Sequence, residues 1–176
     1  MTDRARSAPL RVRDNGAVTR SHPGDGLTDQ EVRDLQDALD DEYKARATYA
    51  QVIADHGQVQ PFVNIVESEQ RHIEALLGLF ERHGIDVPPD PWSGRAPRFS
   101  TREAACRAGV EAEVENAALY DRLLAGTTRP DVLEVYGNLR RASQERHLPA
   151  FRRCAEGSAG AGRQRGRRRR GGRGPR

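Results

Sequence analysis

Residues 64–77 read Asn64-Ile65-Val66-Glu67-Ser68-Glu69-Gln70-Arg71-His72-Ile73-Glu74-Ala75-Leu76-Leu77, which is the pattern of an amphipathic helix. At about 100° per residue, the apolar side chains here fall on one stripe, made of Phe62, Ile65, Val66, Ile73, Leu76, Leu77 and Phe80. Glu69 lies in the middle of that stripe and His72 on its flank, whereas Glu67 and Glu74 point away from its centre. A carboxylate directed into a core is costly unless it is paired. Glu69 and His72, at positions i and i+3, are therefore candidate metal ligands.

The preceding segment predicts another amphipathic helix, from Thr28 to about His56. Thr28 and Glu31 have the spacing of a capping box, and Gly57 can end the helix. The apolar stripe consists of Leu35, Ala38, Leu39, Ala45, Tyr49, Val52 and Ile53. Glu42 lies inside this stripe, so this helix also directs a carboxylate toward the core.

Two connections of different length organise the chain. The link from His56 to Pro61 is short, so the two helices that it joins are predicted to be antiparallel neighbours. The second helix ends near Gly84, and the following residues 84–100 are rich in helix breakers, namely Pro88, Pro89, Pro91, Gly94 and Pro97. A long helix-free connection is uncommon inside a compact domain. We expect it to be a crossover to a second helix pair.

That second pair begins near Ser100 or Thr101. Its first helix is predicted to end near Gly126, with an inward stripe of Cys106, Val110, Val114, Ala117, Tyr120 and Leu124, and Glu113 lies on that stripe. Its second helix is predicted from Pro130 to about Cys154, with a stripe of Val132, Tyr136, Leu139, Ser143, Ala150 and Cys154. His147 lies on the flank of this last stripe.

The sequence thus predicts an all-α four-helix bundle over residues 27–155. Residues 1–26 lack periodicity, and residues 156–176 are Gly/Arg-rich, so both ends are predicted to be disordered. The last fourteen residues contain eight Arg and no acid, so the chain's net charge of +3 becomes −5 when only residues 1–162 are considered. The body is acidic and the tail basic, and such a tail can bind nucleic acid.

Several classes of protein are excluded by composition. Cys106 and Cys154 are the only cysteines, which is too few for a disulfide framework or a zinc ribbon. No apolar run approaches the roughly 18 residues of a membrane span, and the start of the chain lacks the apolar core of a signal peptide. We therefore expect a cytoplasmic protein without a membrane partner, and we leave a homodimer open.

Each of the four predicted helices carries, on or beside its apolar stripe, a Glu or His that could bind a metal ion. These residues are Glu42, Glu69, His72, Glu113 and His147. Counted from the two short links at about 1.5 Å per residue, they fall within roughly two helical turns of one level. Carboxylates can bridge two cations, and imidazole suits iron, manganese or zinc. The pattern predicts a buried metal site.

The sequence also resembles a known group. The segments Asp41-Glu42-Tyr43-Lys44-Ala45, Glu69-Gln70-Arg71-His72, Ala112-Glu113 and Ala142-Ser143-Gln144-Glu145-Arg146-His147-Leu148 are similar to those of the ferritin-like superfamily. Within it, they resemble the bacterial uncharacterised ferritin-like domain proteins of the DUF2202 type, which are relatives of rubrerythrin. The resemblance covers residues 30–154 and implies two helix pairs, a crossover and a carboxylate-bridged dimetal site.

The resemblance implies roles for the five residues. Glu42 would be a terminal ligand, Glu69 and Glu113 bridging candidates, and His72 and His147 terminal nitrogen ligands. The implied cofactor is iron, with manganese or zinc as alternatives, and the implied activity is rubrerythrin-like oxidoreductase or ferroxidase chemistry on O₂, peroxide or Fe(II). The cysteine quartet of rubrerythrin is absent.

One position departs from the superfamily pattern. A second Glu-x-x-His motif would place Glu at 144, where this chain has Gln144. A Gln carbonyl oxygen can coordinate a metal but carries no charge and bridges poorly, and Ser143 faces more inward. The site is therefore expected to hold one or two ions.

Alternative interpretations stay open at this stage. The three carboxylates could be structural and paired with Arg46, Arg71 or Arg122, and the two histidines could be core residues. Tyr49, Tyr120 and Tyr136 are predicted to be core residues, one of which could hydrogen-bond a ligand. Cys106 and Cys154 are predicted to be two buried thiols, with a redox pair as the alternative.

The main alternative function is non-enzymatic. In it, a bundle with a degenerate metal site associates with nucleic acid through its tail, which includes Arg167, Arg168, Arg169 and Arg170. The tail has no interleaved aromatic residues, so base stacking is not supported.

Overall fold

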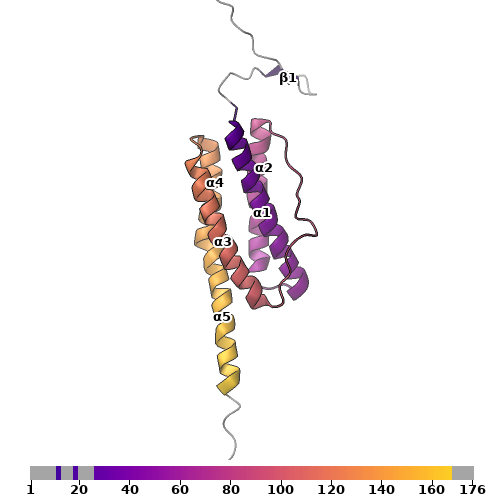
Figure 1. Ribbon diagram of the computed structural model, residues 1–176, viewed down its shortest axis with the longest axis vertical. Coiled ribbons are helices and arrows are strands. Elements are labelled where there is room, and N and C mark those ends of the chain that lie inside the picture. The colour runs from indigo at the N-terminus through magenta and orange to yellow at the C-terminus, as the bar shows by residue number, and fades with distance from the viewer. Residues whose placement is uncertain (1–10, 13–17, 20–25, 168–176) are drawn as a thin grey trace, which may run out of the picture.

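The computed structural model describes residues 11–12, 18–19 and 26–167, and the side chains of residues 26–157. Two short strands, β1 (Arg11–Val12) and β2 (Val18–Thr19), pair antiparallel, with Arg11 opposite Thr19 and Val12 opposite Val18. The rest of the described chain is helical apart from its connections (Figure 1). None of the described helices is both long and apolar enough to cross a membrane.

The first helix pair forms as its end signals predict. Helix α1 (Asp29–His56) follows the N-cap Thr28, and Thr28 and Glu31 form the reciprocal hydrogen bonds of a capping box. Helix α2 (Phe62–His83) ends at Gly84, which adopts the left-handed conformation with φ of 65°. The two helices pack antiparallel along most of their length (Figure 1).

The predicted crossover is confirmed. The chain from Gly84 to Thr101 contains no helix and runs along the side of the first pair back to the opposite end of the bundle (Figure 1). Polar contacts hold it against α1: Arg46 forms an ion pair with Asp90 at 2.7 Å, and the Trp92 indole N–H donates to Asp40 at 2.9 Å. The crossover places the start of α3 (Arg102–Ala125) beside the α1–α2 link.

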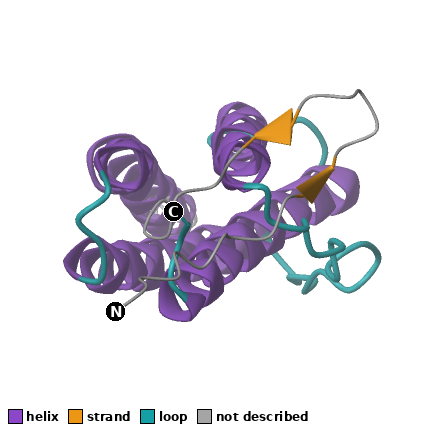
Figure 2. Cartoon of the chain, turned by 90° about the horizontal axis from the view of Figure 1, so that it is seen from above, coloured by secondary structure: helices purple, strands orange, loops and turns teal. Residues whose placement is uncertain are grey.

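The second pair differs from the prediction at its last helix. Helix α4 (Pro130–Ala142) passes through a π-helical turn, η1 (Ser143–His147), into helix α5 (Leu148–Arg167). The predicted end near Cys154 is thus too early, because the helix continues to Arg167, beyond the bundle (Figure 1). Apolar periodicity stops where the helix leaves its neighbours, so the pattern gave no signal for this extension. Figure 2 shows the helices and their connections from above.

The core consists of two apolar clusters. One contains Leu35, Leu39, Ile73, Leu76, Phe80, Tyr120, Leu123, Tyr136 and Leu139, among others. The second contains Tyr49, Val52, Phe62, Ile65, Ala105, Cys106, Phe151 and Cys154. Along the chain, Glu69, His72, Glu113 and His147 lie between residues of one cluster and residues of the other, and Glu42 lies next to Tyr43, the last α1 residue of the first cluster. A polar layer therefore separates two halves of the core.

One residue of α3 that the sequence placed in the core is exposed instead. Val114 is 49% exposed, while Leu123, absent from the predicted stripe, is fully buried. The inward face of α3 follows Cys106, Glu113 and Tyr120. Val114 is one residue, or about 100°, from Glu113, and therefore faces outward.

The prediction of two buried thiols is also wrong. Cys106 and Cys154 form a disulfide that joins α3 to α5 across 48 residues of sequence, with Cα atoms 5.8 Å apart. The two side chains lie on facing stripes near the same end of the pair. The sequence pattern predicted these positions but did not predict that the two cysteines form a disulfide.

Candidate metal centre

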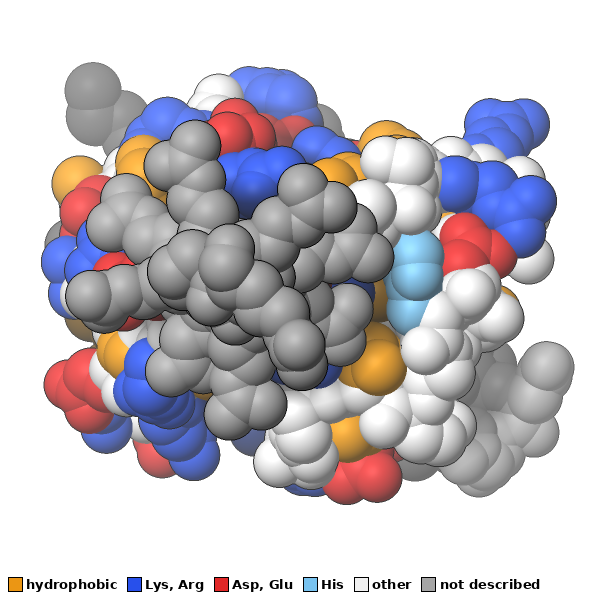
Figure 3. All heavy atoms as spheres, turned by 90° about the horizontal axis from the view of Figure 1, so that it is seen from below, with side chains coloured by type: hydrophobic (Ala, Val, Ile, Leu, Met, Phe, Trp, Pro, Cys, Tyr) orange, Lys and Arg blue, Asp and Glu red, His pale blue; other side chains and the backbone are white. Residues whose placement is uncertain are grey.

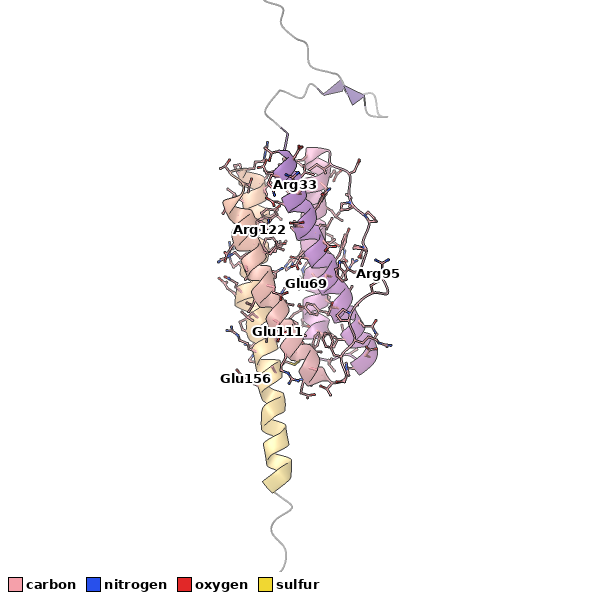
Figure 4. The ribbon with its side chains drawn as sticks, viewed as in Figure 1. Arg33, Glu69, Arg95, Glu111, Arg122 and Glu156 are labelled. Atoms are coloured by element: carbon pink, nitrogen blue, oxygen red, sulfur yellow. A yellow bond between two sulfur atoms is a disulfide. The ribbon has the colours of Figure 1, made fainter. Side chains whose placement is uncertain are left out.

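The five predicted ligands lie together in the polar layer. Glu42 comes from α1, Glu69 and His72 from α2, Glu113 from α3, and His147 from η1, and all five side chains are buried. Even the most exposed of them, His72, is only 8% exposed. Figure 4 labels Glu69 partway along the bundle, between the helix pairs.

The first group joins α1 to α2. His72 Nδ1 lies 2.7 Å from Glu69 Oε2 and 3.1 Å from Glu42 Oε2. The second group joins α2 to the other helix pair. His147 Nδ1 lies 3.2 Å from Glu69 Oε1 and 3.6 Å from Glu113 Oε2.

Glu69 is common to both groups. It turns one carboxylate oxygen toward each imidazole, and the two rings stack with their centroids 5.4 Å apart. In each group, three buried residues offer ligand atoms within 4.8 Å of one another. This is the arrangement that two neighbouring cations sharing one carboxylate require.

Hydroxyl groups fix the outer carboxylates. The phenol of Tyr120 donates to Glu42 Oε1 at 2.8 Å, and that of Tyr49 donates to Glu113 Oε1 at 2.9 Å. Ser143 Oγ donates to Glu113 Oε2 at 2.6 Å. Such partners orient ligands and tune their basicity. Two of the three predicted core tyrosines thus also serve the site, while Tyr136 packs on Tyr120.

Sequence reasoning missed two polar residues of this layer. Asn116 Nδ2 donates to Asp41 Oδ2 at 2.8 Å and approaches Glu42 Oε1 at 3.4 Å, whereas its buried Oδ1 has no hydrogen-bond partner. Ser68 Oγ lies 3.3 Å from His72 Nε2. A signal was present for both, since Asn116 is three residues after Glu113 and Ser68 four before His72, which places each on the ligand face.

Gln144 is half-buried, whereas its neighbour Ser143 is buried and donates to Glu113. The π-helical turn widens the helix here, so that Ser143 and His147, four residues apart, are both buried and both reach Glu113. Beside His147, the side chain of this helix that contacts Glu113 is thus the hydroxyl of Ser143.

The contacts do not support the alternative in which Glu42, Glu69 and Glu113 form ion pairs with arginines. Arg46 pairs with Asp90, and Arg122 pairs with Asp34 and Asp37. Arg71 forms no ion pair with any described residue. The three carboxylates face imidazoles and hydroxyls instead.

Proton affinities in the layer reflect this contact pattern. Burial would raise the pKa of Glu69, but hydrogen bonds from His147 and His72 outweigh it and lower that pKa to about 2. Burial, followed by the charge of Glu69, raises the pKa of Glu42 to about 8. Burial would lower the pKa of both imidazoles, yet their carboxylate partners raise it to about 10 for His72 and about 9 for His147. Positive charge between these carboxylates is therefore strongly favoured.

The donor set fits divalent metal ions. Without metal, a proton on each imidazole Nδ1 lies between two carboxylates, and a cation could take its place. Three carboxylates and two imidazoles form a hard, anionic set that suits iron, manganese or zinc. A cavity of about 180 Å³ between α1 and α3 reaches Glu69 and Glu113 and is also lined by Glu111 and Glu115. Small solutes thus have a path to the layer.

The predicted nucleic-acid residues are not placed by the structure. Arg167 is the last residue of α5, and its side chain is not described. Arg168, Arg169 and Arg170 lie outside the described residues. Association with nucleic acid remains a prediction.

One family model matches the first part of the chain. Residues 31–103 match the model of an uncharacterized protein domain, DUF2202. This segment spans α1, α2 and the crossover, so it includes Glu42, Glu69 and His72. The predicted resemblance to proteins of this type is confirmed.

Individual relatives share the fold. The chain is 27% identical over 149 residues to the uncharacterized protein MJ0754 of Methanocaldococcus jannaschii, covering 74% of this chain and 78% of that protein. The crystal structure of the hypothetical protein MJ0754 superposes with a TM-score of 0.69 at 26% identity, covering 80% of this chain and 87% of that one. A conserved hypothetical protein, rv2844 of Mycobacterium tuberculosis, has a TM-score of 0.63 at 16% identity, covering 73% and 98%.

Proposed function

We propose that the protein binds two metal ions in the polar layer, with iron as the first candidate and manganese or zinc as alternatives. The observation that carries this proposal is the position of Glu69, which offers one oxygen to each of two groups of buried ligands. A buried carboxylate shared in this way needs positive charge on both sides. Two neighbouring cations would supply it.

The contacts suggest a role for each ligand. Glu42 and His72 would hold one ion, Glu113 and His147 the other, and Glu69 would bridge them. Glu113 belongs to one group only, and hydroxyls hold both of its oxygens. It therefore suits a terminal role better than the bridging role that the family resemblance implies.

We further propose redox handling of O₂, peroxide or Fe(II) by this centre. Bound iron would supply electron transfer and Lewis acidity. The protein's own contribution would be to orient the carboxylates through Tyr49 and Tyr120, to surround the layer with two dry apolar clusters, and to admit small solutes through the cavity beside Glu113.

The test is metal content by elemental analysis after reconstitution with Fe(II) and removal of excess metal. We expect two ions per chain in the unaltered protein, fewer than one in Glu69→Gln, and one in Glu42→Gln. Glu69 serves both groups and Glu42 only one, so the two variants should differ. Glu67→Gln, an exposed carboxylate on the same helix, is the matched control and should retain two ions.

Equal metal content in Glu69→Gln and Glu67→Gln would overturn the proposal. One ion in the unaltered protein would refute the two-ion assignment and leave a site for a single metal. If two ions bind, oxidation of Fe(II) by O₂ and by peroxide would be measured next, in the same variants. No oxidation by the loaded protein would refute the redox role and leave metal binding standing.

A further inference from the structure

A basic groove lies on the other side of the bundle from the cavity beside Glu113. It has a volume of about 540 Å³ and is bordered by α2, η1 and α5, with the start of α3 closing one end. The cavity beside Glu113 is bordered by α1 and α3. The two hollows therefore approach the polar layer from different faces.

The groove carries four arginines and no carboxylate. These are Arg71, Arg102, Arg146 and Arg153, which come from α2, α3, η1 and α5. This concentration stands out because residues 1–162 carry a net charge of −5. Figure 3 shows the end of the bundle where α3 begins, with Lys and Arg side chains gathered in several places.

The four guanidinium groups are not neutralised by the described part of the protein. None forms an ion pair with a carboxylate of residues 26–157, whereas other surface arginines do. Arg46 pairs with Asp90, Arg122 with Asp34, and Arg140 with Asp121. Four like charges around one hollow repel one another, and a bound anion would relieve that repulsion.

The other side chains of the groove suit a small phosphate-bearing anion. Asn64, Gln60 and Ser68 line it and supply neutral hydrogen-bonding groups. Guanidinium groups match the oxygen geometry of phosphate through paired N–H donors. The groove has the size of a small-molecule site, and no Phe, Tyr or Trp side chain lines it to stack nucleic-acid bases.

We propose that this groove binds a phosphate group, either as inorganic phosphate or as part of a small phosphate monoester. Arg102 and Arg153 would bind it from one end, and Arg71 and Arg146 from α2 and η1, which carry the candidate ligands Glu69, His72 and His147. The site does not depend on the bundle holding metal. His147 and Ser68 nevertheless belong to both the groove and the polar layer, so a bound phosphate would lie next to that layer.

The test is calorimetric titration of the full-length protein with inorganic phosphate and, separately, with glycerol 3-phosphate. The variant Arg102→Gln with Arg153→Gln removes two groove charges without touching a candidate metal ligand. The control Arg107→Gln with Arg141→Gln removes two exposed charges outside the groove that form no ion pair with a described residue. We expect the groove variant to bind at least about tenfold more weakly, because it loses hydrogen bonds from charged donors, and the control to bind within about twofold of the unaltered protein.

The paired design separates this proposal from others. Equal weakening in both variants would show that only overall charge matters and would overturn the site. Binding unaffected by either change would assign the phosphate to bound metal or to the C-terminal tail, again overturning it. Tight binding of a DNA duplex by the groove arginines, without saturable binding of phosphate or glycerol 3-phosphate, would also refute it.

A second variant guards against a folding defect. Arg102→Lys with Arg153→Lys keeps both charges but loses the paired N–H donors, so its affinity should lie between those of the unaltered protein and the Gln variant. Helical content by circular dichroism should be the same in all variants. The comparison of inorganic phosphate with glycerol 3-phosphate then identifies which form the groove prefers.

Discussion

Glu69 receives one imidazole on each of its carboxylate oxygens, and this single residue links the two helix pairs across the polar layer. Such a buried carboxylate is stable only because positive charge lies on both sides. Without metal, His72 and His147 supply that charge, because their carboxylate partners raise the pKa of both imidazoles. At the residue scale, the layer is thus a set of acids and bases that, under the proposed function, would exchange protons for metal ions.

This exchange predicts that metal-free protein loses stability as the pH rises. The folded pKa of His72 is about 10 and that of His147 about 9, both above the ordinary 6.5. Their contribution to stability is therefore fully present below pH 6.5 and is lost as the pH rises through 9 to 10. Thermal unfolding of chelator-treated protein between pH 6 and 10 measures this.

The variant His72→Gln with His147→Gln is the control, and its stability should change much less over the same range. Metal-loaded protein should likewise resist the rise in pH, because the cations replace the imidazolium protons. Parallel pH curves for the unaltered protein and the double variant would contradict the assignment of charged imidazoles to the layer.

At the scale of elements, α3 and α5 approach closely at Gly109. A Cβ atom at this position would lie 2.6 Å from the ring of Phe151, nearer than packed atoms can lie. The same two helices are joined by the disulfide between Cys106 and Cys154. Close packing and a covalent link thus fix the helix that carries His147 against the helix that carries Glu113.

Gly109→Ala is predicted to destabilise the bundle by about 1–3 kcal/mol, because Phe151 must leave its packed position. Gly78→Ala in α2 is the matched control, since no atom lies within 4 Å of its added Cβ. That control should gain up to about 1 kcal/mol from helix propensity. Urea unfolding of both variants measures the difference, and a gain in stability for Gly109→Ala would refute the close approach.

The disulfide predicts a second stability effect. Replacing both Cys106 and Cys154 by Ala should cost up to about 4 kcal/mol, because the bond closes a 48-residue loop in the unfolded chain. Reductant should lower the stability of the unaltered protein to near that of the variant and leave the variant unchanged. If unfolding of the unaltered protein were insensitive to reductant, the two cysteines would be thiols after all.

At the scale of the whole molecule, the polar layer cuts the apolar core into two clusters. The candidate ligands come from α1, α2, α3 and η1, which are far apart in the sequence, so the unfolded chain cannot bring them together. Metal binding should therefore stabilise the folded state as a unit. Under the proposed function, bound metal would add a further link between the two halves of the core, beside the contacts that His72 and His147 already make.

Chelation is accordingly predicted to lower the midpoint of thermal unfolding of the loaded protein by several degrees. Glu69→Gln should show no such response, whereas Glu67→Gln should respond like the unaltered protein. Differential scanning calorimetry with and without Fe(II), Mn(II) or Zn(II) measures the effect and ranks the metals. The same midpoint with and without each metal would argue against a metal in the layer.

The basic C-terminal segment predicts a separate property of the whole chain. Deleting residues 168–176 removes five of the eight tail arginines and should weaken any DNA binding and its dependence on salt. Metal content should be unaffected, since no ligand lies there. Retention of full DNA affinity after the deletion, measured by fluorescence anisotropy at two salt concentrations, would refute the tail hypothesis.

The sequence by itself determined the spans of α1, α2 and α3 and most of the residues that enter the core. Capping signals, glycines and the 3.6-residue period are local, so α1, α2 and α3 begin and end close to their predicted residues. The candidate ligands were recognisable because a charged or titratable side chain on an apolar stripe is costly to bury unless it is paired. They are Glu42, Glu69, Glu113, His72 and His147. The family resemblance added the expectation that these residues share one site.

Only the tertiary structure decided how those residues meet. A π-helical turn brings Ser143 and His147 together at Glu113, and the packing of the two helix pairs leaves Glu69, not Glu113, between the two histidines. The bond between Cys106 and Cys154, the outward position of Val114 and the convergence of four arginines depend likewise on distances between segments far apart in the chain. A linear pattern fixes which face a residue occupies on its own helix, but contacts between helices are set by how those faces pack.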